Sequence, residues 1–192
     1  RSTEGTLFLD TNTPGTHRAD ILNAVTCVAS LAAPAYGSLF LHGTGLRIRN
    51  KGYLFLGRSG AGKSTVARLA GKHAVLSDDG IIVSRDRGKW RVSPAPLMQT
   101  TGSLRNKHSA SYKLSGVYFL RQAPRTKLMR IAPAKTLSEI LKYYVHFFRF
   151  FDIIRSEKTF NISRVLAGDL TCYRMDFQKN KTYLNLLSGR KL

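Results

Sequence analysis

The feature that most constrains this chain is Gly57-Arg-Ser-Gly-Ala-Gly62-Lys63-Ser64, which follows the apolar run 53–56. It fills every required position of the pattern G-x-x-x-x-G-K-[ST], between a strand-like and a helix-like segment. Glycines let backbone N–H groups curve around phosphate oxygens, and a helix that begins there presents its partly positive end. Lys63 adds a full charge for the terminal phosphates, and the Ser64 hydroxyl is a ligand for Mg²⁺. The pattern therefore predicts a phosphate-binding loop (a P-loop) in an α/β fold.

A pair of carboxylates, Asp78 and Asp79, directly follows the apolar run 74–76. In P-loop proteins a strand beside the loop strand commonly ends in an acid that holds Mg²⁺. One carboxylate of a pair can serve the metal while the other accepts the proton of an attacking hydroxyl. The alternative is a turn or helix-cap pair, which is frequent for Asp. His42, at the end of the run 38–41, is on pattern alone most simply a hydrogen-bonded structural residue.

Periodicity and turn residues predict the remaining elements. Helices are expected at 20–33, where Pro34 ends the first, and at 64–71, 136–154 and 161–167. Strands are expected at 6–9, 38–41, 45–48, 53–56, 74–76, 81–83, 117–120, 127–131 and 171–177. The turn at 49–52 makes 45–56 a hairpin, which gives the loop strand an antiparallel neighbour. Residues 85–97 are expected to be polar, and 98–114 to form a loop.

The net charge of +20 is unevenly distributed along the 192 residues. Residues 1–80 carry 9 Lys and Arg against 5 Asp and Glu, whereas 81–192 carry 22 against 6. Within 81–135 there are 12 basic residues and one acid, Asp86. Such a block predicts a positive surface that attracts nucleotide phosphates, an acidic peptide, nucleic acid or anionic lipid. Charge alone does not choose among these, and no nucleic-acid-binding motif accompanies it.

The apolar fraction of 43% predicts a single domain over residues 1–192 with a substantial core. No apolar stretch is long enough to cross a bilayer, and Cys27 and Cys172 are expected to be reduced, so a soluble, cytoplasmic protein is expected. The chain begins with Arg1 rather than Met, which leaves open whether residues precede it. The aromatic run 143–151 indicates core or a homo-oligomer interface. The histidines lack metal-ligand spacing.

Four segments in order resemble the catalytic domain of the HPr kinase/phosphorylase family, whose core is related to that of phosphoenolpyruvate carboxykinase. They are Leu41-His42-Gly43, the hairpin 45–56, the loop 57–64 and Leu76-Ser-Asp78-Asp79-Gly. The resemblance implies an α/β, P-loop-containing mixed sheet flanked by helices, with the kinase core at 36–155 and further elements at 156–192. It also implies transfer of the γ-phosphate of ATP, with Mg²⁺, to a serine-type hydroxyl.

Together, the motif and the resemblance assign a role to each site residue. By position, Asp78 resembles the catalytic base, Asp79 its acidic neighbour near the metal, and His42 the histidine that contacts the reacting phosphate; Lys63 completes the catalytic set, and Ser64 joins Asp79 at the metal. Nucleotide binding is assigned to Gly57, Arg58, Ser59, Gly60, Ala61, Gly62, Lys63, Ser64 and Thr65.

Two departures from the family pattern narrow the expected activity. The family's Glu after the loop serine is Thr65 here, and its later Glu-x-Arg-Gly-x-Gly signature is not found after residue 80. They point away from the reverse phosphorylase reaction and toward reduced HPr-kinase-like enzymes, such as those that accompany lasso-peptide biosynthesis.

The leading hypothesis is an ATP-dependent kinase whose acidic peptide or protein acceptor docks on the basic surface of residues 85–130. Two alternatives stay open. One is a kinase of free serine or another small hydroxyl compound. The other is a nucleotide-regulated protein that binds nucleic acid, with an affinity that falls steeply as salt rises.

Overall fold

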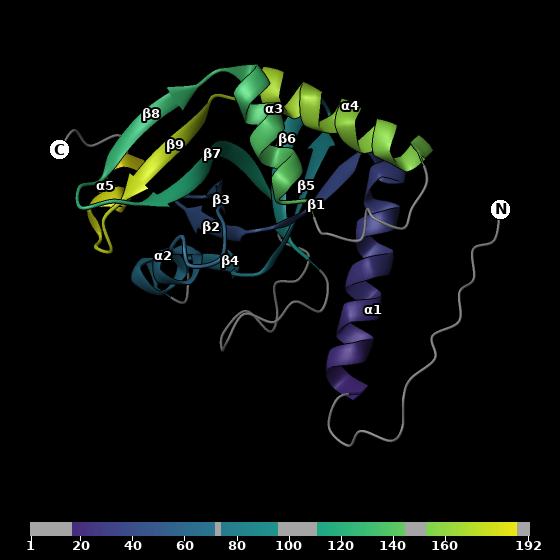
Figure 1. Ribbon diagram of the computed structural model, residues 1–192, viewed down its shortest axis with the longest axis horizontal. Helices are drawn as coiled ribbons and strands as arrows, with labels where there is room; N and C mark the ends of the chain where they lie inside the picture. Colours follow the sequence, from purple (N-terminus) through teal and green to yellow (C-terminus); the bar gives the residue numbers. More distant parts are fainter. Residues whose placement is uncertain (1–16, 72–73, 96–110, 145–152, 188–192) are drawn as a thin grey trace.

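The computed structural model describes residues 17–71, 74–95, 111–144 and 153–187. Within them nine strands pair into a mixed sheet in the order β1-β5-β6-β7-β3-β2-β4, with β9 added to β7 and β8 added to β9 (Figure 1). The strands are β1 (Ser38–His42), β2 (Thr44–Ile48), β3 (Lys51–Leu56), β4 (Val75–Ser77), β5 (Gly80–Asp86), β6 (Lys89–Pro94), β7 (Tyr112–Gln122), β8 (Lys127–Ile131) and β9 (Cys172–Phe177). The helices are α1 (His17–Ala32), the 3-10 helix η1 (Ala33–Tyr36), α2 (Lys63–Ala70), α3 (Pro133–Lys142), α4 (Ile153–Asp169) and α5 (Thr182–Leu187). The chain has the predicted α/β architecture with a mixed sheet flanked by helices.

The strand that leads into the glycine-rich loop, β3, lies between an antiparallel and a parallel neighbour. Its antiparallel neighbour β2 confirms the hairpin predicted at 45–56. The hairpin turns at Arg49 and Asn50, whose φ angles of 49° and 62° are those that a tight hairpin turn requires. On the other side β7 runs parallel to β3, and β9 runs parallel to β7. The carboxyl ends of β3, β7 and β9 therefore meet at one edge of the sheet.

In other P-loop proteins the strand that ends in the acidic residue commonly lies beside the loop strand, so we expected β4 to pair with β3. It does not. Instead β4 pairs with β2 and so lies one strand further out. The pair Asp78-Asp79 then forms the short connection to β5, whose antiparallel partner β1 ends at His42. This pairing brings the end of β1 next to the acidic turn, because His42 is opposite Gly80 in the β1–β5 register.

The segment expected to be polar at 85–97 contains a strand. β5 and β6 form an antiparallel hairpin that turns at Arg87 and Gly88, with φ angles of 46° and 76°. Trp90 and Val92 are buried while the residues between them are more exposed, so the alternation was present in the sequence. β7 begins at Tyr112, which pairs with β6, and not at 117. The strand predicted at 6–9 and most of the loop predicted at 98–114 lie outside the described residues.

The single helix predicted at 136–154 is wrong in its C-terminal boundary. α3 ends at Lys142, and Tyr143 has φ −107° and ψ 5°. Tyr144 forms a bridge with Leu41 of β1, and its hydroxyl donates to the carbonyl of Ser30 at 2.7 Å. The tertiary contacts of Tyr144 therefore replace the next helical turn. The rest of the aromatic run, 145–151, lies outside the described residues, α4 begins at 153 rather than 161, and α5 was not predicted.

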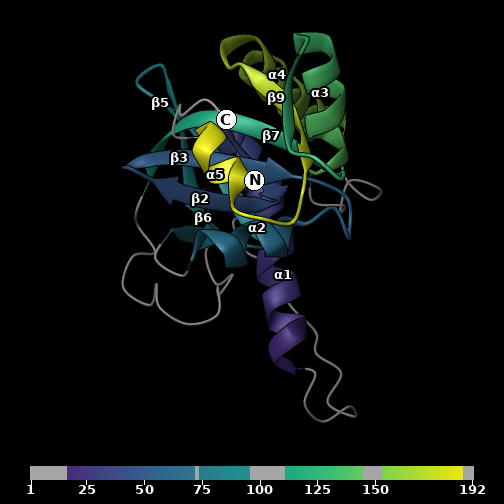
Figure 2. The same cartoon turned by 90° about the vertical axis from the view of Figure 1, so that its left-hand side faces the viewer.

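The core lies on both faces of the sheet. Leu54 and Leu56 of β3 belong to a buried cluster with residues of α3 and α4, such as Ile140 and Leu166. The alternate residues Tyr53 and Phe55 belong to a second buried cluster with residues of α2 and α5. Figures 1 and 2 show α3 and α4 on one side of the sheet and α2 on the other. Burial on both faces explains why β3 is apolar throughout 53–56.

Two simpler expectations concern cysteines and membranes. Cys27 and Cys172 are both free thiols, as predicted. None of the helices in the described part of the chain combines the length and the apolarity that crossing a membrane needs.

Candidate functional site

The glycine-rich loop, residues 57–62, joins the end of β3 to the first turn of α2. Gly60 and Gly62 have φ angles of 78° and 110°, a conformation that L side chains rarely adopt. Gly62 is the N-cap of α2 and supplies no side chain, so no side-chain hydrogen bond caps the helix. The first N–H groups of α2 therefore lack the partner that a capping residue would provide. This strand, loop and helix arrangement is the context that the motif requires.

Lys63 is folded back into this loop. Its side chain is buried, and Nζ donates to the carbonyl oxygens of Gly57 at 2.7 Å and Arg58 at 3.3 Å. Burial lowers the pKa of Lys63, and the nearby Asp79 carboxylate partly opposes that effect. Because its acceptors are neutral carbonyls, the ammonium retains a charge that an incoming anion can neutralise.

His42 and Asp79 form an ion pair opposite the loop. His42 Nδ1 lies 2.8 Å from Asp79 Oδ1, and the side chains are 48% and 55% exposed. The backbone fixes both residues, since Gly43 N donates to the carbonyl of Asp79 and His42 N donates to the carbonyl of Tyr143, each at 2.9 Å. The hydrogen bond from His42 is the main cause that holds the pKa of Asp79 below its ordinary value, with a smaller contribution from Lys63. Asp79 is therefore a carboxylate at neutral pH.

These groups line a common pocket of about 540 Å³, which we name the loop pocket. Its lining residues are His42, Ser59, Gly60, Gly62, Lys63, Ser64, Thr65, Asp78, Asp79, Gln122 and Lys179. The acidic pair, the histidine and the lysine that the sequence suggested are thus brought together. Of the other predicted residues, Gly57 is buried and accepts from Lys63, while Arg58 and Ala61 face a neighbouring pocket.

Gln122 and Lys179, which were not predicted as site residues, also line the loop pocket. Gln122 ends β7, and its side-chain amide donates to the carbonyl of Gly60. Lys179 follows the end of β9. A usable signal existed, because the predicted strands 117–120 and 171–177 are both followed directly by polar residues. If they run parallel to the loop strand, those ends gather beside the loop.

The loop pocket fits Mg²⁺ shared with a ligand rather than a metal held by protein alone. The Ser64 hydroxyl and the Asp79 carboxylate are oxygen ligands of the kind that Mg²⁺ prefers. Across the ranges that the structure describes, no group of three or more His, Cys, Asp or Glu side chains is placed to hold a metal. Mg²⁺ is commonly bound through one or two carboxylates together with substrate phosphates and water.

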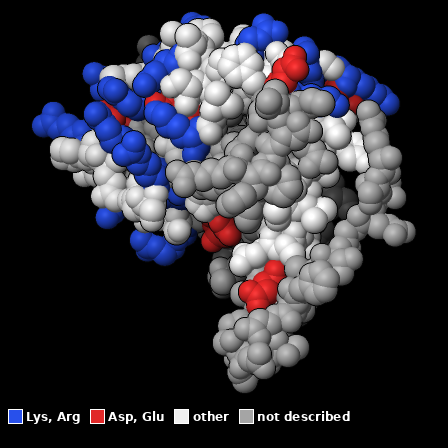
Figure 3. Space-filling model, turned by 45° about the vertical axis from the view of Figure 1, so that its right-hand side comes forward, with Lys and Arg blue, Asp and Glu red and all other residues white. Residues whose placement is uncertain are grey.

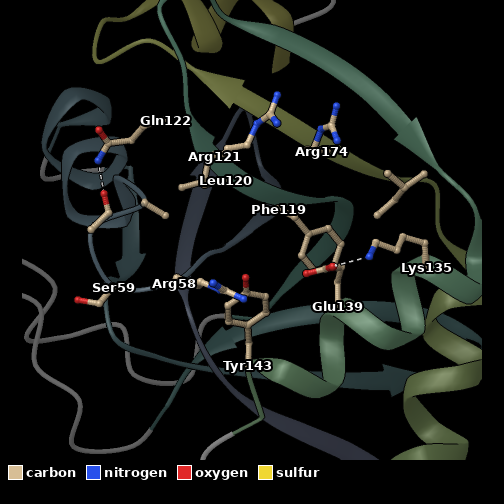
Figure 4. A pocket seen from close by; sticks show the side chains of 13 residues that line it. Arg58, Ser59, Phe119, Leu120, Arg121, Gln122, Lys135, Glu139, Tyr143 and Arg174 are labelled. Atoms are coloured by element: carbon tan, nitrogen blue, oxygen red, sulfur yellow. Dashed lines mark hydrogen bonds and ion pairs between the residues drawn. The ribbon is translucent and has the colours of Figure 1, made fainter.

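A second pocket of about 720 Å³ opens on the other side of the glycine-rich loop, and we name it the arginine pocket (Figure 4). It shares Ser59, Gly60 and Gln122 with the loop pocket. Five apolar or aromatic residues line it, namely Ala61, Phe119, Leu120, Ile131 and Tyr143. Four cations also line it, namely Arg58, Arg121, Lys135 and Arg174. The remaining charge in its lining is Glu139.

The basic block in the sequence divides between two places in the structure. Arg85 pairs with Asp169 of α4 at 3.1 Å, and its strand β5 turns back at residues 87–88, whereas the exposed cations at and beyond the end of β7 form a separate group. Since Arg91 pairs with Lys113, eight residues before Arg121, the two places are roughly 25 Å apart along β7. We name the second group the cationic end; it comprises Arg121, Arg125, Lys127, Arg130, Arg174, Lys179 and Lys181. Figure 3 shows Lys and Arg side chains gathered in this way on its left-hand side.

Comparison with known proteins gives one family. No curated protein matches the chain. The chain is similar to a solved structure of the Hpr(Ser) kinase/phosphatase from Coxiella burnetii. The match covers 78% of this chain and 86% of that chain, with 11% sequence identity and a TM-score of 0.43. The family model of the SynChlorMet cassette protein ScmC matches residues 10–162, which include the glycine-rich loop, the acidic pair and the segments that form both pockets up to α3. The chain therefore belongs to the ScmC family of SynChlorMet cassette proteins.

Proposed function

We propose that the protein is a kinase that transfers the γ-phosphate of ATP to a serine-type hydroxyl on a peptide or protein. The observation that carries this proposal is the loop pocket, where Lys63 and the start of α2 face the ion pair of His42 and Asp79. The wall with Lys63 and the backbone N–H groups suits the anionic phosphates. The opposite wall carries carboxylates, which suit the metal ion that accompanies the phosphates. The resemblance of these same segments to the HPr kinase/phosphorylase family supports the same chemistry.

The glycine-rich wall would bind the nucleotide. Backbone N–H groups of the loop and of the first turn of α2 would donate to phosphate oxygens, and Lys63 would exchange its carbonyl acceptors for phosphate. Ser64 and Asp79 would hold Mg²⁺, which when bound neutralises charge on the phosphates. His42 donates Nδ1–H to Asp79, and in the imidazolium form its Nε2–H would donate to a phosphate oxygen.

Asp78 would act as the base. It lines the loop pocket, and within the described residues no side chain pairs with it, whereas Asp79 is tied to His42. The acceptor hydroxyl would transfer its proton to the Asp78 carboxylate while its oxygen forms a bond to the γ-phosphorus. The bond from that phosphorus to the bridging oxygen breaks, and ADP leaves with the electron pair. Positioning and charge stabilisation supply most of the rate in such a transfer.

The test is γ-phosphate transfer from MgATP to a panel of serine peptides, free serine and HPr, followed by mass spectrometry. We expect the wild type to phosphorylate at least one peptide and Lys63→Ala to lose both nucleotide binding and transfer. Asp78→Asn should retain nucleotide binding and lose transfer. A wild type that binds no MgATP would refute the proposal, and normal transfer by Asp78→Asn would refute the assignment of the base.

A further inference from the structure

The arginine pocket adjoins the loop pocket, where the phosphates are proposed to bind. Its lining includes residues 58–61, the first part of the glycine-rich loop, whereas Ser64 and Thr65 line only the loop pocket. It also includes Tyr143, whose carbonyl accepts from the backbone N–H of His42. The arginine pocket therefore adjoins the loop pocket at Ser59, Gly60 and Gln122, and the backbone of Tyr143 connects its wall to His42.

The charges of the arginine pocket are poorly balanced. Its carboxylate, Glu139, is already engaged by Lys135 at 3.2 Å and by Lys142 at 2.8 Å. Arg121 is engaged in the same way by Asp176, with two hydrogen bonds of 2.9 and 2.8 Å.

The guanidinium groups of Arg174 and Arg58 are less fully neutralised by carboxylates. Arg174 Nε lies 3.7 Å from Asp176, a looser contact, and no carboxylate within the described residues pairs with Arg58. Arg58 and Tyr143 both line the pocket, and Figure 4 shows the Arg58 guanidinium on the side of the Tyr143 ring.

The walls of the arginine pocket add an apolar component. Ring atoms of Phe119 and Tyr143, whose centroids are 6.2 Å apart, form one side, and Ile131 of β8 lies on the wall as well. A volume of about 720 Å³ is within the range of pockets that enclose a drug-sized ligand. It is larger than a free amino acid needs and too small for the face of a folded protein, so a short chain segment suits it.

We infer that the arginine pocket binds the acceptor as a short peptide segment in which the reacting hydroxyl is flanked by a carboxylate and an apolar side chain. The carboxylate would bind Arg174 and Arg58, because guanidinium groups bind carboxylates through paired hydrogen bonds. The apolar side chain would pack on Phe119, Ile131 and Tyr143. The hydroxyl would then reach the loop pocket across the shared edge at Ser59 and Gly60. This inference rests on the proposed kinase function.

The test measures peptide specificity and nucleotide affinity separately. Three serine peptides would differ at one flanking position, with Asp, Asn or Lys there and Leu on the other flank. Transfer would be compared for the wild type, Arg174→Gln, Arg174→Glu and the control Arg164→Gln on the exposed surface of α4. Affinity for a fluorescent non-hydrolysable ATP analogue would be measured for each variant.

We expect the wild type to prefer the Asp peptide, and Arg174→Gln to raise its KM about tenfold, the loss that removal of one charged hydrogen bond produces. Arg174→Glu should shift the preference toward the Lys peptide, which a merely structural role would not do. Nucleotide affinity should stay unchanged in all variants, and Arg164→Gln should behave as the wild type.

Three results would overturn the inference. Equal use of the three peptides by a wild type that does transfer phosphate would overturn the inference and leave the proposed function intact. Weaker nucleotide binding in Arg174→Gln would mean that the pocket holds the nucleoside. Free serine used as well as the peptides would mean that no peptide segment occupies the pocket. If no acceptor is phosphorylated, binding of the labelled peptides beside the ATP analogue still tests the pocket, while the proposed function itself fails.

Discussion

The loop pocket and the arginine pocket share an edge at Ser59 and Gly60, but the chain builds them in different ways. Most of the loop pocket comes from a few consecutive residues, and its important groups are backbone N–H groups, one lysine and an ion pair. The arginine pocket takes side chains from the loop and from β7, β8, α3 and β9. The part of the loop pocket formed by residues 59–65 is therefore specified by a local motif, whereas its other residues and the arginine pocket depend on how distant segments pair. If the two pockets hold the nucleotide and the acceptor as proposed, substitutions in the distant segments would change acceptor recognition without changing the glycine-rich loop.

The largest expected effect tests the loop pocket alone. Asp78→Asn should lower the rate of phosphoryl transfer by about 10²–10⁴-fold, the usual contribution of a general base. Its affinity for the ATP analogue should remain close to that of the wild type, because Asp78 is not assigned to the phosphates. Single-turnover transfer and equilibrium binding measure the two effects. A parallel loss of binding would show that Asp78 belongs to the nucleotide site instead.

The second prediction concerns the backbone of the loop. Gly62→Ala should lower the free energy of unfolding by about 1–2 kcal/mol and weaken nucleotide binding, because a Cβ is strained at a φ of 110° and would lie 3.0 Å from the Phe177 ring. Chemical denaturation measures the first effect and titration with the ATP analogue the second.

Gly168→Ala is the matched control for Gly62→Ala. Gly168 lies in α4, and an added Cβ there meets no atom within 4 Å. It should raise the free energy of unfolding by about 0.5–1 kcal/mol, the ordinary difference between Gly and Ala in a helix. Equal effects of the two substitutions on the free energy of unfolding would show that the loop conformation does not require glycine at position 62.

The third prediction is a pH dependence of the ion pair in the loop pocket. Because the pKa of Asp79 is lowered below 3.8 in the folded protein, its ionised form stabilises the fold above that pH. The contribution is lost as the pH falls through the lowered value. The pair is about half exposed, so the effect should be under about 1 kcal/mol. An NMR titration of Asp79 in His42→Gln should show its pKa rising toward 3.8, and an unchanged pKa would contradict the pair.

The smallest expected effect concerns the cationic end. Its exposed Lys and Arg side chains would attract any polyanion at low salt, and the affinity falls steeply as the salt concentration rises. At about 0.15 M salt, where the Debye length is about 8 Å, we expect no measurable binding of a single-stranded oligonucleotide. Fluorescence anisotropy over a salt series checks this. Retained affinity at that salt would favour the nucleic-acid-binding alternative.

The same contrast explains how much could be predicted from the sequence. The hairpin before the loop, the loop strand and α2 follow from local signals, namely turn residues, alternation and the glycine pattern. The clustering of His42 with Asp79 was expected only from a family resemblance, since it depends on the pairing of β1 with β5. Gln122 and Lys179 depend in the same way on two parallel pairings that no local pattern reveals.

The errors have physical causes of the same kind. The strand at Lys89–Pro94 alternates in burial, but its charged residues and Pro94 resemble a polar loop when its partner strands are unknown. The helix boundary at Lys142 was missed because apolar residues continue beyond it. Tyr144 is drawn instead into contact with Leu41 and Ser30, which lie more than a hundred residues earlier.

The amide of Gln122, which donates to the carbonyl of Gly60, stands in the wall that separates the two pockets. A ligand in either pocket that displaces this side chain would remove a hydrogen bond from the loop backbone. Such coupling is reciprocal: if one ligand changes the affinity of the second ligand by a given factor, the second changes the affinity of the first by the same factor. For two ligands coupled through this amide, the order of binding would not alter the stability of the complex that they form together.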